Sequence, residues 1–326
     1  MTVNSAHPLQ QYIEKSSRLV FGCMGLGGNW DDPNYGADHI KQAHLAIDTA
    51  LESGITLFDH ADIYTIGKAE RVFGEVLKQR PELRQQIALQ SKCGIRFQDG
   101  DTPGRYDFSK DYIMQSVDGI LSRLGVEHIE LLLLHRPDPL MEVDEVAEAF
   151  QLLTEQGKVS HFGVSNMQSQ QMAYLNSALK KPLIVNQLEL SLSHLAWLEE
   201  GVTAGCSGFG SSNFAAGTLE YCAQQKIQLQ SWGSLSQGLF SGRDVSSQPE
   251  NIVNTANLVS SLADKYQTTK EAIVLAWLMR HPGKIQPVIG TTNSSRIRDC
   301  AQSIHVNLSR EDWYKLFVAS RGEALP

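Results

Sequence analysis

An acid and a phenol lie close together where a short apolar run ends, at Asp59 and Tyr64. The run Thr56-Leu57-Phe58 is typical of a buried strand, which places Asp59 where that strand stops and Tyr64 in the loop that follows. Aspartate is rarely buried without a partner, so Asp59 implies a cation from elsewhere in the chain. A loop tyrosine alone usually only covers apolar surface, with its hydroxyl in water. The pair therefore indicates a site only if other strand ends supply a lysine and a further donor.

Two more polar side chains do follow apolar runs. Lys92 comes after Ile-Ala-Leu-Gln-Ser, and His135 comes after four leucines. Taken singly, such a lysine can be a solvated rim residue, and such a histidine is more often a satisfied core residue than a catalyst. Their recurrence at equivalent strand ends favours a shared site.

Together these four residues predict a proton donor. A phenol titrates near pH ~10, a neighbouring ammonium lowers its pKa, and a carboxylate keeps that ammonium charged. Tyr64 would then donate a proton to an oxygen on which negative charge develops, while His135 orients that oxygen. None of the four side chains supplies a hydride, so the set lacks an electron source.

Later strand ends carry residues suited to a nicotinamide-like ring. Trp232 offers a flat face for stacking, and Ser165, Asn166 and Gln187 offer donors and acceptors for a carboxamide. Ordinary loop polarity would explain each of them alone. Their order along successive strand ends is what favours a binding site.

Cations and glycines near other strand ends suit phosphate groups. Thr291, Thr292 and Arg296 lie where the last strand passes into a helix, whose N-terminus attracts phosphate. Arg243 follows a second glycine-rich loop. Gly27 and Gly28 allow a backbone to approach a ligand or simply make a turn, and their G-x-G-G pattern lacks the spacing of a dinucleotide fingerprint.

The hydrophobic pattern alternates between strands and helices along the whole chain. We expect strands near 19–24, 55–58, 87–92, 129–134, 161–164, 183–185, 227–230 and 287–289, and helices near 39–53, 68–79, 110–124, 142–156, 168–180, 214–225, 251–266, 269–281 and 294–303. Parallel neighbours need crossover connections, so eight such units predict an α/β fold, a closed (β/α)₈ TIM barrel forming a single domain over residues 1–326. Residues 1–18 are expected as an arm or hairpin, and 304–326 as a segment outside the repeat with a helix near 310–320. For 191–213 we expect loop and a short helix.

Composition narrows the function classes. The net charge of −8 argues against a nucleic-acid partner, and apolar runs such as Ile129–Leu134 are too short to cross a membrane. The start of the chain has no signal-peptide pattern, and the five cysteines lack C-x-x-C spacing, so we expect a cytoplasmic protein with reduced thiols. The ten histidines lack metal-ligand spacing, so no metal site is expected.

From about Leu19 to Arg298 the chain resembles the aldo-keto reductase superfamily, and most of all its bacterial branch with a short C-terminus. The motifs that carry the resemblance are Phe58-Asp59-His60-Ala61-Asp62-Ile63-Tyr64, Ser91-Lys92-Cys93-Gly94, Leu124-Gly125-Val126, Leu134-His135-Arg136-Pro137-Asp138-Pro139, Gly157-Lys158-Val159, Phe162-Gly163-Val164-Ser165-Asn166, Asn186-Gln187-Leu188-Glu189 and Val288-Ile289-Gly290-Thr291.

The resemblance implies a catalytic tetrad and an extended NADP(H) without a Rossmann fold. The tetrad would be Asp59, Tyr64, Lys92 and His135. Ser165, Asn166 and Gln187 would hold the carboxamide, Trp232 would stack on the nicotinamide, and Gly290, Thr292 and Arg296 would lie along the 2′-phosphate end. The full set of expected cofactor contacts is Gly27, Gly28, Ser165, Asn166, Gln187, Trp232, Gly233, Leu235, Arg243, Gly290, Thr291, Thr292 and Arg296.

The chain departs from the family pattern in three places. Trp232 stands where many members have Tyr, which keeps the stacking, and Cys300 stands where an Asn near the adenine is common. Residues 191–213 match family patterns poorly.

The expected function is NADPH-dependent reduction of a small aldehyde or ketone by a protein that we expect to be a monomer. Two alternatives stay open. One is a non-catalytic NADP-binding module that senses redox state for a partner. The other is a TIM-barrel aldolase that uses Lys92 as a Schiff-base amine, which would have no use for Trp232 or Arg296.

Overall fold

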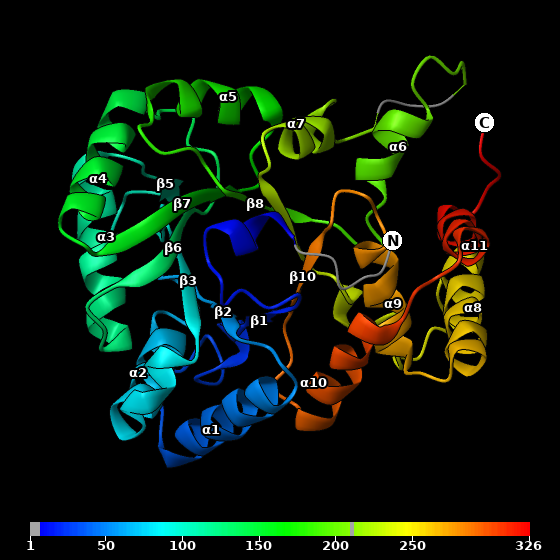
Figure 1. Ribbon diagram of the computed structural model, residues 1–326, viewed down its shortest axis with the longest axis horizontal. Coiled ribbons are helices and arrows are strands. Elements are labelled where there is room, and N and C mark those ends of the chain that lie inside the picture. Colours follow the sequence, from blue (N-terminus) through cyan, green and yellow to red (C-terminus); the bar gives the residue numbers. More distant parts are fainter. Residues whose placement is uncertain (1–6, 209–211) are drawn as a thin grey trace.

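Eight parallel strands close into a barrel in the structure, a computed structural model that describes residues 7–208 and 212–326 (Figure 1). Around the barrel the order is β1-β10-β9-β8-β7-β6-β3-β2, so β1 pairs with both β2 and β10. This confirms the predicted single-domain (β/α)₈ barrel. The barrel strands are β1 (Val20–Gly22), β2 (Leu57–Asp59), β3 (Ala88–Cys93), β6 (Ile129–Leu134), β7 (Val159–Ser165), β8 (Val185–Glu189), β9 (Gln228–Trp232) and β10 (Gln286–Ile289).

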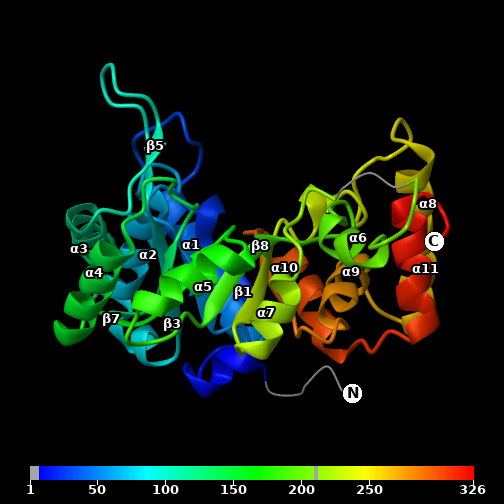
Figure 2. The same cartoon turned by 90° about the horizontal axis from the view of Figure 1, so that it is seen from above.

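Helices alternate with the strands and cover the outside of the barrel (Figure 1). The α-helices are α1 (Ala37–Glu52), α2 (Lys68–Gln79), α3 (Lys110–Leu124), α4 (Val143–Glu155), α5 (Ser169–Ala178), α6 (Ala196–Val202), α7 (Thr218–Gln224), α8 (Glu250–Tyr266), α9 (Lys270–Met279), α10 (Ser294–Ala301) and α11 (Arg310–Arg321). Short 3₁₀ helices are η1 (Pro8–Gln11), η2 (Cys23–Gly25), η3 (Pro81–Gln85), η4 (Ser236–Gly238) and η5 (Gln302–His305). The C-terminal α11 packs against α8 at one side, as Figures 1 and 2 agree. No helix among the described residues is long and apolar enough to span a membrane.

Local sequence signals explain where several helices begin and end. The backbone N–H of Tyr112 donates to the Ser109 side chain, which caps α3 as its position before an apolar periodic run predicts. The same helix ends at Gly125, whose φ of 65° is a left-handed conformation that glycine adopts without strain. The α3 boundaries therefore match the expected ones.

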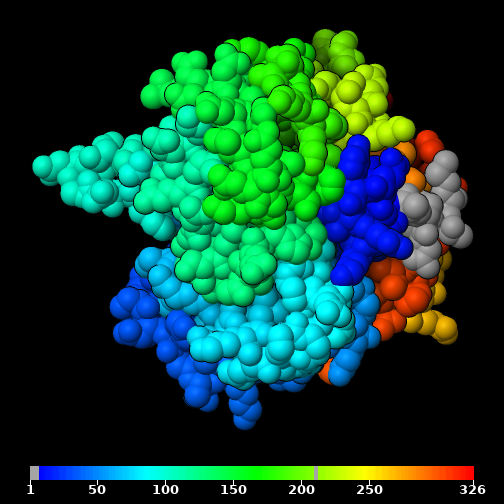
Figure 3. Space-filling model, turned by 60° about the vertical axis from the view of Figure 1, so that its left-hand side comes forward, coloured from blue at the N-terminus to red at the C-terminus, as the bar shows by residue number. Residues whose placement is uncertain are grey.

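Two apolar layers hold the barrel together. The larger one lies between the sheet and the surrounding helices. The smaller one fills the interior of the barrel at the end where the strands begin. There Leu9 and Ile13 of the N-terminal segment lie against inward-facing strand residues such as Leu57 and Leu131. The segment thus closes the barrel end opposite the strand C-termini, and Figure 3 shows it in blue on the surface.

Two features were not expected from the sequence. The loop after β3 contains a small antiparallel hairpin, β4 (Ile95–Arg96) with β5 (Arg105–Tyr106), which projects from the molecule (Figures 2 and 3). Strand β8 also begins at Val185, where the expected strand 183–185 ends. Within 191–213 the structure forms the short helix α6, and residues 209–211 of that expected loop lie outside the described residues.

Candidate active site

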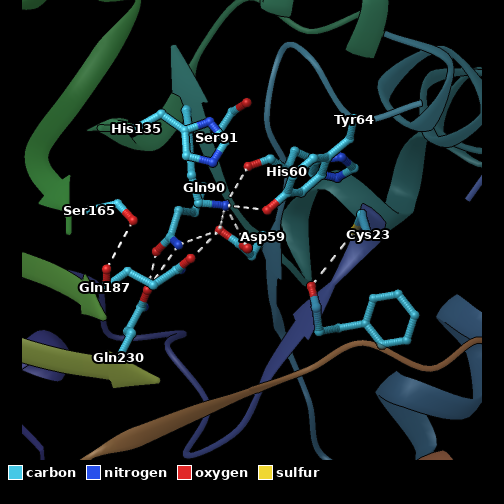
Figure 4. Close-up of polar contacts among 12 residues, drawn as sticks. Cys23, Asp59, His60, Tyr64, Gln90, Ser91, His135, Ser165, Gln187 and Gln230 are labelled. Carbon is cyan, nitrogen blue, oxygen red and sulfur yellow. Dashed lines mark hydrogen bonds and ion pairs between the residues drawn. The ribbon is translucent and has the colours of Figure 1, made fainter. Parts of the chain in front are cut away.

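Three of the predicted tetrad residues form one hydrogen-bonded group at the C-terminal ends of β2 and β3 (Figure 4). The Lys92 Nζ atom lies 2.7 Å from both carboxylate oxygens of Asp59 and 2.9 Å from the Tyr64 hydroxyl. It also donates to the His60 backbone carbonyl at 2.9 Å. Lys92 and Asp59 are almost fully buried, at 0% and 1% exposure. A buried charge pair with this geometry fixes the ammonium beneath the phenol.

The fourth predicted residue, His135, faces Tyr64 from the end of β6. The two rings meet edge to face with centroids 6.1 Å apart. The His135 backbone N–H donates to the Cys93 carbonyl, and its own carbonyl accepts from the Asn166 side chain at 3.2 Å. Burial, with Lys92 and Arg136 nearby, lowers the pKa of His135 well below its ordinary value. The imidazole is therefore neutral at physiological pH and suited to donating a hydrogen bond.

The net direction of the Tyr64 pKa is opposite to the predicted one. Burial raises the pKa of Tyr64 to about 12, and the opposing effect of Lys92 does not offset it. Burial also disfavours a charged Lys92, but Asp59 and Tyr64 together outweigh it and raise the pKa of that lysine. Sequence reasoning counted the ammonium and left out desolvation, because burial of the phenol depends on how the loops pack.

The predicted carboxamide-binding residues come together beside the tetrad. The Trp232 indole N–H donates to the Asn166 side-chain oxygen at 3.0 Å, and the Asn166 amide donates to Ser165 Oγ at 2.8 Å. Ser165 Oγ in turn donates to the Gln187 carbonyl at 2.9 Å (Figure 4). Asn166 has a φ of 60°, a conformation that asparagine tolerates better than most residues. These contacts fix the orientation of the Trp232 ring and of the amide groups.

Arg136 is a cation at this site that sequence reasoning did not use. Its guanidinium carbon lies 5.6 Å from the centre of the Trp232 ring, within the range of a cation–π contact. It also contributes to the lowered pKa of His135. Its position directly after His135 in the sequence indicated that Arg136 could lie at the same site.

The residues expected near phosphates lie around the start of α10 and in the loop after β9. Asn293 caps α10 and accepts from the Arg296 backbone N–H at 3.2 Å, while the Arg296 side chain is exposed. Thr291 Oγ1 accepts from Asn293 N at 3.2 Å, and Thr292 Oγ1 accepts from Gln42. Gly290, directly before Thr291, and Arg243, in the loop after β9, are exposed at the surface. The structure thus leaves Arg296 and Arg243 accessible to an anion.

The remaining expected contacts are shaped by packing. A Cβ on Gly27 would lie 2.8 Å from Lys68 Cβ, so close approach requires glycine there. Gly28 meets only the end of the His39 side chain, but its φ of +80° favours glycine as well. Gly233 has a φ of 66° after β9, and the partly buried Leu235 packs on the core. The Cys300 side chain is fully buried in the core.

The buried Glu70 and the partly buried Asp62, which lie beside the tetrad, were also missed. Glu70 accepts from Ser91 Oγ and pairs with Arg123 at 2.7 Å. Beside it, burial raises the pKa of Asp62 to about 7, with the Glu70 carboxylate as the second cause.

Inside the barrel, Gln90 donates to Asp59 Oδ1 at 2.6 Å and to Gln230 at 2.9 Å. Glutamines flanked by apolar strand residues were the signal for this inner network. Among the described residues no cluster of His, Cys, Asp or Glu could hold a metal ion.

Comparison with known proteins shows the family to which the chain belongs. Residues 18–317 match the aldo/keto reductase family. The chain is 33% identical to a 6-dehydroglucose reductase of Agrobacterium fabrum over 94% of its length and 95% of the relative's, and 35% identical to oxidoreductase YcsN of Bacillus subtilis over 95% and 96%. The glycerol dehydrogenase structure from Gluconobacter oxydans shares the fold, with a TM-score of 0.77 at 22% identity over 95% of this chain and 94% of that one. The protein is an oxidoreductase that belongs to the aldo/keto reductase family.

Proposed function

We propose that the protein reduces aldehydes or ketones to alcohols with NADPH, and that Tyr64 is the general acid. The observation that carries the proposal is the position of the Lys92 Nζ atom, 2.7 Å from each Asp59 oxygen and 2.9 Å from the Tyr64 hydroxyl. A fixed ammonium beside a phenol stabilises the negative charge that develops when the phenol gives up its proton.

The polar groups beside the tetrad fit a nicotinamide ring with its carboxamide. Ser165, Asn166 and Gln187 carry the donors and acceptors that a carboxamide requires, and their own contacts hold them in place. Trp232 would lie against the ring, and its orientation is set by the Asn166 hydrogen bond. When bound, NADPH supplies the hydride that these side chains lack.

The chain's own groups have distinct parts in this proposal. The neutral His135 donates a hydrogen bond to the carbonyl oxygen and turns it toward Tyr64. Tyr64 gives its proton to that oxygen, and Lys92 stabilises the phenolate left behind. Asp59 holds the ammonium in place through both carboxylate oxygens.

The state of Lys92 weighs against the aldolase alternative. A Schiff-base lysine must lose its proton to act as a nucleophile, which a lowered pKa favours. Here Asp59 and Tyr64 raise the pKa of Lys92, and its Nζ atom already lies within hydrogen-bonding distance of four oxygens, which engages all three of its N–H groups. The complete tetrad weighs against a purely sensory module, which would need no proton donor.

NADPH is the proposed cofactor rather than NADH, because Arg296 lies exposed in the first turn of α10, near the loop that follows β10. For the substrate, the Agrobacterium relative named a 6-dehydroglucose reductase makes aldehydes on polyhydroxylated carbon chains the first compounds to test.

The decisive experiment compares the wild type with Tyr64→Phe. This change removes the hydroxyl and keeps the ring that packs on the core. Proton transfer by a positioned group contributes about 10²–10⁴-fold, so kcat for NADPH oxidation with a good carbonyl substrate should fall by that order while the Kd for NADPH stays the same. Near-normal turnover in Tyr64→Phe would refute the assignment of Tyr64, and His135 would become the candidate acid.

A screen of carbonyl compounds with the wild type separates the alternatives. Absence of NADPH oxidation across a broad aldehyde and ketone panel, with tight NADPH binding retained, would favour the sensory module. Trapping of a covalent substrate adduct on Lys92 with borohydride would favour the aldolase.

A further inference from the structure

Four glutamine side chains lie inside the barrel, directly below the tetrad. Inward-facing residues of such barrels are mostly branched aliphatic ones. A buried amide is costly unless its hydrogen bonds are made, so a buried group of them calls for a physical reason. The four are Gln90 on β3, Gln187 on β8, Gln230 on β9 and Gln286 on β10, each 2% exposed or less.

These amides form a continuous hydrogen-bonded chain between the N-terminal segment and Asp59. Gln286 Nε2 donates to the Ser17 carbonyl at 2.6 Å, and Gln286 Oε1 accepts from Gln230 Nε2 at 3.0 Å. Gln230 and Gln90 then pair reciprocally, at 3.0 and 2.9 Å. Gln90 Nε2 finally donates to Asp59 Oδ1 at 2.6 Å, as Figure 4 shows.

The direction of every amide in this chain is fixed by its ends. A backbone carbonyl such as that of Ser17 can only accept, so Gln286 must present its NH₂ group there and its oxygen to Gln230. The Asp59 carboxylate is likewise an acceptor, so Gln90 must present its NH₂ group to it. Exchanging the oxygen and nitrogen of Gln230 would bring two NH₂ groups together at Gln90. Both ends therefore impose the same orientation on Gln230.

This orientation, together with the Asp59 carboxylate, determines which atom of Gln187 is left for a ligand. Gln187 Nε2 donates to Gln230 Oε1 at 2.9 Å and to Asp59 Oδ1 at 3.3 Å. Both of its N–H groups are therefore used inside the barrel, and its oxygen remains as the group that can accept. A carboxamide NH₂ group needs such an acceptor.

We propose that Gln230 and Gln90 are positioning residues for the active site. Gln230 fixes the Gln187 amide so that its oxygen faces the carboxamide of the cofactor, and Gln90 fixes the Asp59 carboxylate that aims Lys92 at Tyr64. The inference rests on the proposed function, since it assigns the carboxamide of NADPH as the ligand of Gln187.

The test uses Gln230→Met, which keeps the length of the side chain and removes its hydrogen bonds. The measured quantity is the ratio of two dissociation constants, one for NADPH and one for its analogue with an acetyl group in place of the carboxamide. The acetyl group has no N–H to donate to Gln187. The wild type should prefer NADPH, and Gln230→Met should reduce that preference about three- to tenfold, the effect of one hydrogen bond.

Gln228→Met is the matched control. Gln228 is on the same strand and is also fully buried, but its amide bonds with His7 and with the Lys284 carbonyl, away from Asp59. General damage to the barrel core would affect both variants, whereas only Gln230→Met should change the ratio. If Gln230→Met does not fold, Gln90→Met removes the amide that pairs with Gln230 and should reduce the same ratio.

Three outcomes overturn the inference. One is an unchanged ratio in the variant, and another is an equal loss of preference in Gln228→Met. The third is a wild type that binds NADPH without preferring it to the analogue. A wild type that does not bind NADPH at all refutes the proposed function itself, and the inference with it.

Discussion

At the scale of single residues, the site combines a phenol that holds its proton tightly with an imidazole that stays neutral. Burial raises the pKa of Tyr64 to about 12, and burial beside two cations lowers that of His135 well below its ordinary value. Neither group therefore changes charge near neutral pH. An oxygen at this site meets a proton donor and a hydrogen-bond donor whose states do not depend on modest changes in pH.

We therefore expect the rate of carbonyl reduction to be nearly independent of pH between ~6 and ~9. In the proposed mechanism the active form of Tyr64 is the protonated one, so activity should fall only as the pH rises toward its pKa of about 12. The measurement is kcat against pH at saturating NADPH and substrate. A fall in kcat with a midpoint near pH ~7 would contradict this expectation.

Asp62 should make the fold less stable as the pH rises through the neutral range. Its pKa is about 7 in the folded protein against an ordinary 3.8, so between these values the folded state holds a proton that the unfolded state has lost. Folding stability therefore decreases from pH ~4 to pH ~7 through this group. Asp62→Asn removes the charge and should therefore raise the free energy of unfolding at pH ~8. We expect a gain of about 1–2 kcal/mol, less than the full pKa shift implies, because solvent screens a partly exposed side chain.

Urea unfolding of wild type and Asp62→Asn at pH ~4 and pH ~8 tests this prediction. The two proteins should differ little at the lower pH, where the aspartate is protonated in both states. An equal difference at both pH values would mean that the carboxylate charge is not the cause.

At the scale of elements, α10 presents two arginines in different surroundings. Arg298 pairs with Glu52 of α1 at 3.3 Å, whereas the side chain of Arg296 is exposed in the first turn, where Asn293 caps the helix. A phosphate at this helix terminus would meet the positive end of the helix dipole and the exposed guanidinium of Arg296 together. This contrast within one helix provides a matched pair of variants.

Arg296→Ala should reduce the preference for NADPH over NADH by about ten- to a hundredfold, since a charge-assisted bond to phosphate is worth about 1.5–3 kcal/mol. Arg298→Ala should leave the preference unchanged. Titration of both cofactors against the wild type and the two variants gives the necessary constants. Equal affinities for NADPH and NADH in the wild type would refute the proposed preference for NADPH.

The elements best predicted from the sequence are those with strong local signals. The start of α3 follows from Ser109, and its end follows from Gly125. The tetrad follows from strand ends, because a closed parallel barrel brings the C-terminal ends of its strands together whatever the helices do. The β4–β5 hairpin has two-residue strands without an alternating pattern, so hydrophobic periodicity could not predict it.

The inner amide network and the pKa of Tyr64 were beyond local reasoning for a different reason. Gln90 and Gln230 are 140 residues apart in the chain, and their pairing depends on which strands become neighbours across the barrel. The Tyr64 pKa depends on how closely the loops cover the phenol. Both are properties of tertiary packing, which a single strand or loop does not encode.

At the scale of the whole molecule, the N-terminal segment is part of the core. Leu9 is fully buried in the cluster that fills the lower barrel, and Gln286 donates to Ser17 just beyond it. Removing a leucine side chain from such a place creates a cavity. The same change on the outside of a helix leaves none.

Leu9→Ala should lower the free energy of unfolding by about 2–5 kcal/mol. Leu45→Ala is the control, since Leu45 on α1 is 56% exposed, and it should change stability by less than about 0.5 kcal/mol. Chemical denaturation of both variants measures the difference. Similar small losses in the two would show that the segment does not contribute to the core.

The closure of the barrel between its first and last strands has a consequence for the protein during synthesis. All four tetrad residues have been made once the ribosome reaches His135, but two amides that support Asp59, on β8 and β9, follow later. Strand β1 gains its second neighbour only when β10 emerges, close to the end of the chain. Until then the growing chain presents an open parallel sheet whose edges can pair with other chains. The time between the synthesis of the four tetrad residues and the closure of the barrel is therefore a period in which the sheet edges of the nascent protein are open to aggregation.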